Sequence, residues 1–128
     1  MTADEPGTAN DGPVVFVNRF TVRCAPEIFE KVFAETSAFV AKQPGFVQFT
    51  LLGHVEDRSS YVNVAYWRDA ASFRQAVSHP EFKPHTEALR AVSTSEPNLY
   101  TCRQTIAVKP LSDWPDTSRG VEGGAERR

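Results

Sequence analysis

The chain has 128 residues, of which 41% are hydrophobic and 23% charged, and its formal net charge at pH 7 is -2. This length suits one domain, and the charge excludes the strongly basic surface that binding to nucleic acid requires. No apolar run reaches membrane-spanning length, and the opening segment is acidic and polar, so we expect a cytoplasmic protein without a signal peptide. Residues 1–12 lack hydrophobic periodicity and are predicted to form a disordered tail.

The first predicted elements are a strand and a helix. Residues 14–23 alternate between two faces, and one face carries Phe16 and Asn18 among apolar side chains. Residues 25–42 place apolar side chains, Phe33 among them, at helical spacing. A buried amide on an apolar strand face needs a hydrogen-bond partner, which makes Asn18 a candidate functional residue.

Two further strands are predicted at residues 46–54 and 61–68, joined by a hairpin. In the second of them, Asn63, Ala65 and Trp67 point to the same face. The amide and the indole both need partners if they are buried. The small Ala65 between them leaves space for a flat ligand.

Two short helical segments follow. Asp69 has the character of an N-cap for a helix over residues 70–78. His79 and Pro80 interrupt the pattern before a second helix. On that helix Phe82, His85 and Leu89 share a stripe at helical spacing.

The last strand is predicted at residues 98–108, after a loop at residues 93–97. Residues 110–128 are rich in Pro, Gly, Ser and charge, and we expect a flexible tail there. Within residues 13–109 the order of elements is β-α-β-β-α-β. This order predicts an α+β ferredoxin-like fold, with an antiparallel sheet and helices on one face.

The opposite face of the sheet is also predicted to be apolar, because Val62, Val64 and Tyr66 alternate with the residues that face the helices. A single copy of the chain has no element left to cover this face. We therefore expect a homodimer in which two sheets pack against each other.

Several motifs resemble the antibiotic biosynthesis monooxygenase superfamily, whose members form dimeric α/β barrels: F-V-N-R-F-T-V, Q-P-G-F and Y-V-N-V-A-Y-W-R-D-A-A-S-F. The N-x-x-x-W spacing of Asn63 and Trp67 is similar to the small anthrone oxygenases of aromatic polyketide pathways. That resemblance implies a monooxygenase without metal, flavin or haem cofactor. It inserts one oxygen atom of O2 into the activated methylene of a polycyclic anthrone, giving an anthraquinone and water. It also implies catalytic roles for Asn18, Asn63 and Trp67.

Oxygenation without a cofactor is chemically reasonable when the substrate is itself an electron donor. An anthrone that loses a methylene proton becomes an extended enolate, which can reduce O2 directly. An amide of Asn18 or Asn63 could donate to the enolate oxygen, and the Trp67 N–H could bond the substrate or a peroxide. Substrate-binding side chains are predicted to be Phe16, Phe33, Ala65, Phe82, His85 and Leu89.

Three alternatives stay open at this point. Asn18 and Asn63 could bond backbone, and Trp67 could anchor the core, without any role in catalysis. A haem-degrading oxygenase of the same superfamily would use Asn18, Trp67 and His85, with His85 as the iron ligand. A non-catalytic dimer could bind a polyketide or another hydrophobic ligand.

Overall fold

The structure of the protein is a computed structural model that describes residues 12–107. In chain order its elements are β1 (Val14–Val22), α2 (Pro26–Val40), β2 (Phe46–Gly53), β3 (Ser60–Trp67), α3 (Ala70–Val77), α4 (Phe82–Val92) and β4 (Ser93–Thr101). Except for the last strand, the predicted helices and strands are confirmed, and their predicted bounds lie within two residues of the observed ones. The predicted tails, apart from Gly12, lie outside the described residues.

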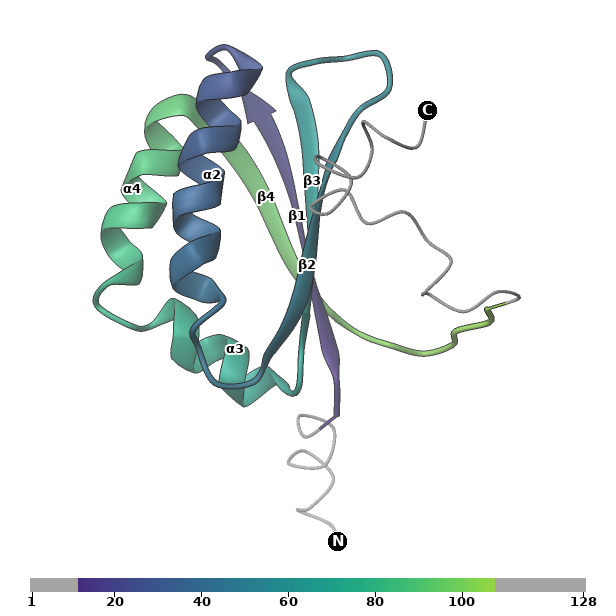
Figure 1. The fold of residues 1–128 in the computed structure, drawn as a ribbon. Coiled ribbons are helices and arrows are strands. Elements are labelled where there is room, and N and C mark those ends of the chain that lie inside the picture. Colours follow the sequence, from purple (N-terminus) through teal and green to yellow (C-terminus); the bar gives the residue numbers. More distant parts are fainter. Residues whose placement is uncertain (1–11, 108–128) are drawn as a thin grey trace, which may run out of the picture.

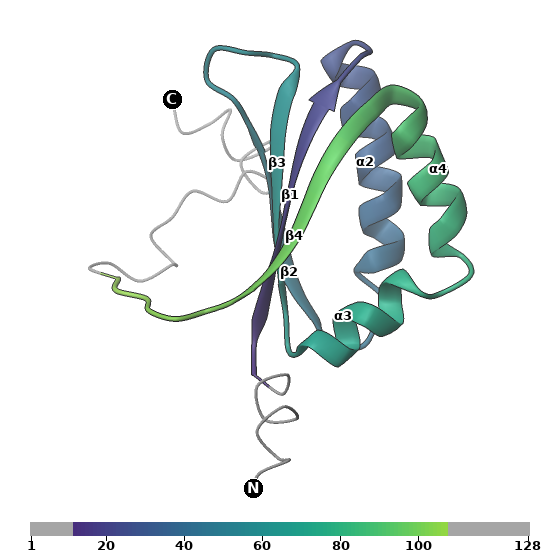
Figure 2. The same ribbon diagram turned by 180° about the vertical axis from the view of Figure 1, so that it is seen from behind.

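The four strands form one antiparallel sheet in the order β2-β3-β1-β4. Figure 1 shows the three helices on one face of this sheet, with α2 and α4 side by side. The view from behind in Figure 2 shows the same two layers. The α+β ferredoxin-like architecture is therefore confirmed.

Alternation along β1 and β3 is also confirmed. The two central strands pair so that Asn18 lies opposite Asn63, Phe16 opposite Ala65 and Val14 opposite Trp67. On β3 the side chains that face the helices are buried, whereas Tyr66 on the other face is 41% exposed. The central strands therefore present the predicted polar residues to the space beneath the helices.

The side chains of β2 do not alternate strictly at the start of the strand. Strict alternation places Phe46 and Phe49 on opposite faces, but the register with β3 shifts between Phe46 and Gln48. Phe46 then lies opposite Trp67 and Phe49 opposite Ala65, so both phenylalanines face the helices. An extra residue in one strand of an antiparallel pair has this effect on every side chain beyond it.

The predicted last strand begins five residues too late. β4 starts at Ser93, directly after α4, and pairs with β1 from Val22 opposite Ser93 to Val14 opposite Thr101. The segment at residues 93–97 looks like a loop because it is polar and contains Pro97. An edge strand tolerates proline, since its outer side has no hydrogen bonds to lose. Residues 102–107 are not part of the strand, and Val108 lies outside the described residues.

The core between sheet and helices consists of two clusters of buried side chains. One lies at the start of β1 and the end of β3, where Val14, Ala65 and Trp67 pack with residues of α3. The other contains Phe20, Phe29, Phe33 and Tyr61 near the opposite ends of these strands. Asn18 and Asn63 lie midway along β1 and β3, between the two clusters.

The face of the sheet away from the helices exposes large apolar side chains, among them Val47, Leu52, Tyr66 and Tyr100. The predicted homodimer would cover this face, and it stays a prediction. The longest helix within residues 12–107 is α2, with 15 residues. No helix in this range is long and apolar enough to cross a membrane.

Candidate active site

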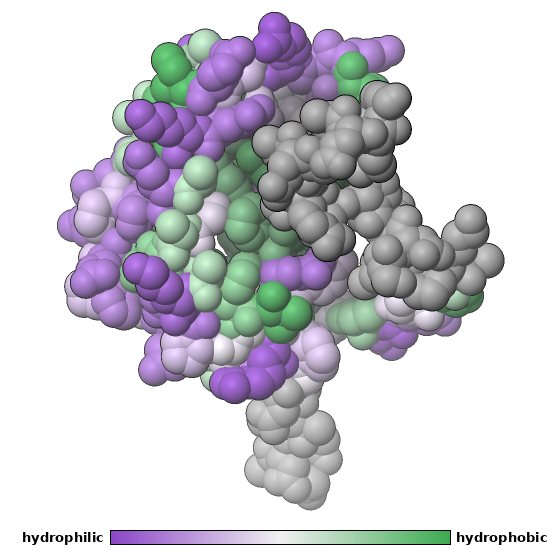
Figure 3. Space-filling model, in the orientation of Figure 1, coloured by the Kyte–Doolittle hydropathy of each residue, from purple (hydrophilic) through white to green (hydrophobic). Residues whose placement is uncertain are grey.

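A cavity of about 490 Å³ lies between the sheet and the helices. Its walls are mainly apolar, and they come from all four strands and from all three helices. In the orientation of Figure 3, hydrophobic side chains surround a hollow in the surface between α2 and β2. Seven phenylalanines line the cavity: Phe16, Phe20, Phe33, Phe46, Phe49, Phe73 and Phe82. Such a space suits a flat polycyclic ligand.

Two amides lie on the sheet side of this cavity. Asn18 and Asn63 both line it, and Asn63 is only 8% exposed. The side-chain oxygen of each is buried and has no hydrogen-bond partner within the described residues. Rotating an amide by half a turn exchanges its oxygen and nitrogen, so each residue can present an acceptor or a donor to a ligand. A buried polar atom without a partner is costly, and a bound ligand would supply the missing hydrogen bond.

Trp67 is the third polar residue of the site. Its ring is 2% exposed, and it meets Phe46 at 5.2 Å and Phe73 at 5.7 Å between ring centroids, edge to face in both cases. Its indole Nε1–H is buried without a partner among the described residues. Trp67 therefore has the packing of a core residue and also a free donor at the cavity.

Four hydroxyl side chains of the lining are satisfied within the protein. Thr36, Ser37, Thr86 and Ser93 each donate to the backbone carbonyl four residues earlier, over 2.7–3.2 Å. Asn18, Asn63 and Trp67 differ from them, because within residues 12–107 only these three side chains have a buried polar atom without a partner. The three residues predicted to be catalytic are thus the three that lack partners, and all of them line one cavity.

The structure brings most of the predicted substrate-binding residues together. Phe16, Phe33, Ala65, Phe82 and Leu89 line the cavity. His85 is not among the lining side chains. Its ring stacks on Phe39 of α2, with 5.5 Å between the centroids and 28° between the planes.

The geometry of α4 explains the difference. One side of α4 faces the cavity and carries Phe82, Thr86, Leu89 and Arg90, which recur at helical spacing. His85 lies on the side of the helix that meets α2. A haem ligand would have to point into the cavity. The residues present therefore do not fit the haem hypothesis at His85. No group of three or more His, Cys, Asp or Glu within residues 12–107 could hold a metal ion.

Sequence reasoning missed the part of the lining that comes from β4 and the end of α4. Ser93, Ser95, Pro97 and Asn98 line the cavity, but the predicted loop gave them no defined orientation. Arg90 also lines it, and no carboxylate of the described residues pairs with its side chain. The four-residue spacing from Phe82 through Thr86 to Arg90 is the signal that could have identified it.

Neither a carboxylate nor a histidine lines the cavity within the described part of the chain. The group with the largest pKa change, Tyr61, lies outside it. Burial and a 2.7 Å hydrogen bond to Glu30 raise the pKa of Tyr61 to about 12, so this phenol stays protonated. The cavity therefore offers hydrogen bonds and one cation, but it offers no strong base.

This combination of an antiparallel sheet, a layer of helices and a cavity between them is found in a known family. The chain belongs to the antibiotic biosynthesis monooxygenase family, whose model matches residues 13–88. This confirms the resemblance seen in the sequence motifs.

Two comparisons are more specific. The chain is 54% identical over 105 residues to deoxynogalonate monooxygenase of Streptomyces nogalater. The matched region covers 79% of this chain and 89% of that protein. The crystal structure of SnoaB, a cofactor-independent oxygenase from the same organism, superimposes with a TM-score of 0.73 and 57% identity. That match covers 74% of this chain and 97% of SnoaB. The expectation of an oxygenase of the cofactor-independent kind is therefore confirmed.

A more distant match shows the fold alone. A conserved protein from Methanosarcina mazei is 18% identical and superimposes with a TM-score of 0.65, covering 73% of this chain and 95% of the other.

Proposed function

We propose that this protein oxidises the activated methylene of a polycyclic anthrone, an intermediate of an aromatic polyketide pathway, to the carbonyl of an anthraquinone. The observation that carries the proposal is the set of three unsatisfied polar atoms, on Asn18, Asn63 and Trp67, in an otherwise mainly apolar cavity. The similarity to a relative named deoxynogalonate monooxygenase supports it. The balance is one methylene and one O2 to one carbonyl and one water.

The reaction begins with loss of one methylene proton, which gives an extended enolate. The enolate transfers one electron to O2, and the resulting radical pair combines to a peroxide anion on the same carbon, which takes up a proton to become a hydroperoxide. Loss of the second proton from that carbon, with cleavage of the O–O bond, releases water and leaves the new carbonyl. The substrate supplies all the electrons, as a cofactor does in other oxygenases.

The residues of the site favour this sequence by stabilising charge and holding the reactants. Rotated to present Nδ2–H, the amides of Asn18 and Asn63 donate to the oxygen on which the enolate charge develops. The Trp67 N–H donates to the substrate or to the peroxide. Aromatic walls hold the flat rings beside O2 and keep water away, which strengthens each of these hydrogen bonds.

The first proton leaves the substrate without a strong base in the wall of the cavity. The described lining contains no carboxylate and no histidine, so the acceptor of this first proton is water. Stabilising the enolate lowers the pKa of the methylene, and hydrogen bonds from the amides serve this purpose. Turnover is therefore expected to depend on the amides rather than on a titrating side chain.

Arg90 suits a substrate that carries an acidic group. Arg90 lines the cavity, its side chain has no carboxylate partner in the described residues, and it would pair with a carboxylate of the polyketide. The Streptomyces nogalater relative is named for deoxynogalonate, a carboxylate, which agrees with this assignment.

We also propose that two copies associate through the apolar outer face of the sheet. Val47, Leu52, Tyr66 and Tyr100 are 41–62% exposed in a single copy, and together they form a surface that favours association. Sedimentation of the protein and of a Tyr66→Glu variant tests this. A monomeric wild-type protein would contradict the proposal.

The test of the activity is O2 consumption by metal-free protein supplied with dithranol, a simple anthrone, while the quinone is followed by its absorbance. We expect equal consumption of O2 and formation of quinone, unaffected by chelators and strongly reduced in Asn63→Ala and Trp67→Phe. A rate no higher than the uncatalysed one, together with tight binding of the anthrone, would favour the non-catalytic binding protein instead.

A further inference from the structure

We propose that Arg68, Asp69, Ser72 and Gly45, here called the polar clamp, position the indole of Trp67 for the reaction. None of these four residues lines the cavity. They act through the aromatic side chains next to them in the chain. This inference rests on the proposed function, because it assigns to the clamp the orientation of the N–H that the substrate uses.

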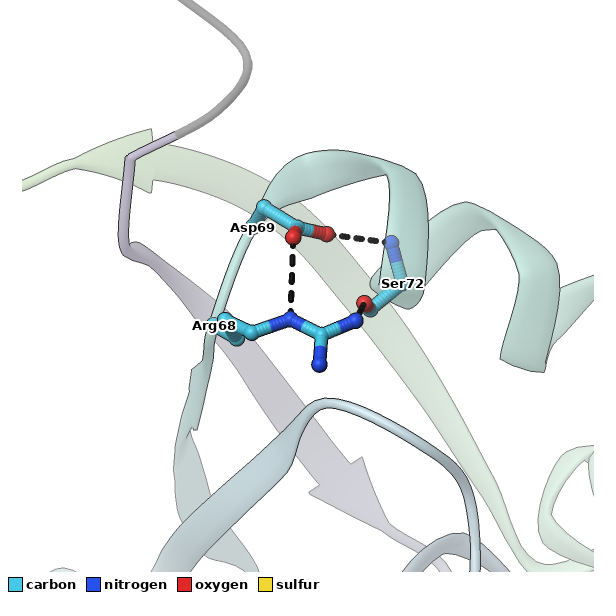
Figure 4. Close-up of polar contacts among 3 residues, drawn as sticks. All are labelled: Arg68, Asp69 and Ser72. Carbon is cyan, nitrogen blue, oxygen red and sulfur yellow. Dashed lines mark hydrogen bonds and ion pairs between the residues drawn. The ribbon is translucent and has the colours of Figure 1, made fainter.

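Hydrogen bonds connect Arg68, Asp69 and Ser72, three members of the clamp (Figure 4). The Arg68 guanidinium donates from Nε to the Asp69 carboxylate at 3.1 Å and from Nη2 to the Ser72 hydroxyl at 2.9 Å. The second Asp69 oxygen accepts from the backbone N–H of Ser72 at 2.7 Å and caps α3. Arg68 thus ties the end of β3 to the first turn of α3.

Gly45 brings the start of β2 to the same place. Its carbonyl accepts from the backbone N–H of Arg68 at 2.7 Å. Its φ of +87° lies in the left-handed region, and a Cβ at this position would collide with the side chain of Ser72. The close approach of the turn before β2 to α3 therefore requires glycine, and Ser72 is 4% exposed beneath it.

Three members of the clamp are each next to one aromatic residue. Gly45 precedes Phe46, Arg68 follows Trp67 and Ser72 precedes Phe73. Phe46 and Phe73 are the rings that meet the indole edge to face, at 76° and 79°. The clamp therefore fixes the three chain segments whose side chains set the plane of the Trp67 ring.

The plane of the ring matters because an indole has one N–H, and that N–H points in one direction only. A hydrogen bond that acts in the transition state loses most of its value when its donor moves by about 1 Å. Phe46 lies between the turn at Gly45 and the register shift of β2, so only its own pairing with Trp67 and the turn at Gly45 fix its place. Loosening the clamp is expected to let the rings shift together.

The test uses Arg68→Ala and Ser72→Ala, with Arg58→Ala as the matched control. Arg58 is also an exposed arginine with one carboxylate neighbour, Glu27 at 3.7 Å, and it is not a lining residue of the cavity. We expect kcat for anthrone oxidation to fall roughly tenfold in the clamp variants, with KM within about twofold of the wild-type value. The control is expected to retain wild-type kcat.

A double-mutant cycle separates positioning from general stabilisation. If Arg68 acts through Trp67, adding Arg68→Ala to Trp67→Phe causes little further loss of kcat. Additive losses, or an unchanged kcat in Arg68→Ala, would overturn the proposal.

A measurement that needs no turnover tests the clamp separately from the proposed function. Replacing Trp114 by Phe leaves Trp67 as the only tryptophan of the chain. In that background we expect Arg68→Ala to increase quenching of Trp67 fluorescence by acrylamide, and Arg58→Ala to leave it unchanged. Unchanged quenching in Arg68→Ala would contradict the clamp even if the oxygenase is active. Increased quenching without any turnover would contradict the oxygenase and leave the packing role of the clamp in place.

Discussion

Asn18 on β1 and Asn63 on β3 are direct cross-strand partners, and both line one cavity with a buried side-chain oxygen that has no partner within the described residues. Two adjacent amides on the central strands of a sheet are expensive to bury unless they bond to each other or to something else. Neither forms a hydrogen bond within the described residues through its buried oxygen. A ligand with oxygen atoms along its edge is the partner that this arrangement favours.

Replacing Asn63 by Leu is expected to separate activity from stability. Leu has nearly the shape of Asn, and removing an unsatisfied buried polar group is neutral or stabilising. We therefore expect the melting temperature to stay level or rise, while kcat falls by roughly 10²-fold, the usual effect of losing an oxyanion donor. The control is Val62→Leu on the opposite face of the same strand. A parallel loss of stability and activity in Asn63→Leu would assign this amide to the fold instead.

Replacing Arg90 by Gln is expected to affect acidic substrates selectively. A charge-assisted hydrogen bond is worth about 1.5–3 kcal/mol, so KM for an anthrone carrying a carboxylate should rise by about tenfold or more. Dithranol has no carboxylate, and its KM should change little. Steady-state kinetics with both substrates measure this difference. Equal changes in KM for the two substrates would show that Arg90 does not bind the acidic group.

Replacing His85 by Ala is expected to leave turnover intact. Its ring stacks on Phe39 outside the cavity, so the loss falls on packing between α4 and α2 and costs about 0.5–1.5 kcal/mol of unfolding free energy. Denaturant titration measures that cost, and O2 consumption measures the activity. Loss of turnover in His85→Ala, or a haem absorption band that this substitution removes, would support the haem hypothesis.

Acid is expected to weaken the start of α3 through Asp69. Hydrogen bonds from the backbone and the hydroxyl of Ser72, with a smaller effect of Arg68, hold the pKa of Asp69 below its ordinary value of 3.8. Because the pKa of Asp69 is lower in the folded than in the unfolded protein, its ionised carboxylate stabilises the fold. This stabilisation is fully present above about pH 4 and is lost as the pH falls through the folded pKa. Asp69→Asn should therefore melt at a lower temperature at neutral pH and lose less stability in acid than the wild-type protein does. Thermal melts from pH 7 to pH 2.5 measure this, and identical slopes would contradict it.

Strand alternation was sufficient to predict the three polar residues of the site. In β1 and β3 the side chains alternate without interruption, so Asn18, Asn63 and Trp67 had to share one face. Their lack of partners could not be predicted, because it depends on which side chains of the helices lie opposite. Thr36 and Ser37 lie there, and both donate to carbonyls of their own helix.

The errors have local causes. One register shift at the start of β2 turns Phe46 toward the helices, and a pattern of period two does not reveal it. The first half of β4 is polar because it lies at an edge, so it resembled a loop. On α4, His85 and Thr86 are neighbours in the chain, so their side chains point in different directions around the helix. His85 meets Phe39, and Thr86 lines the cavity.

The most direct test of the account is a turnover of metal-free protein with an anthrone under ¹⁸O2, with the quinone analysed by mass spectrometry. The account predicts one ¹⁸O atom in each quinone molecule formed by the wild-type protein and little labelled product above background from Asn63→Ala or Trp67→Phe. A quinone that takes its new oxygen from water, or equal labelled product from wild-type and variant proteins, would contradict it.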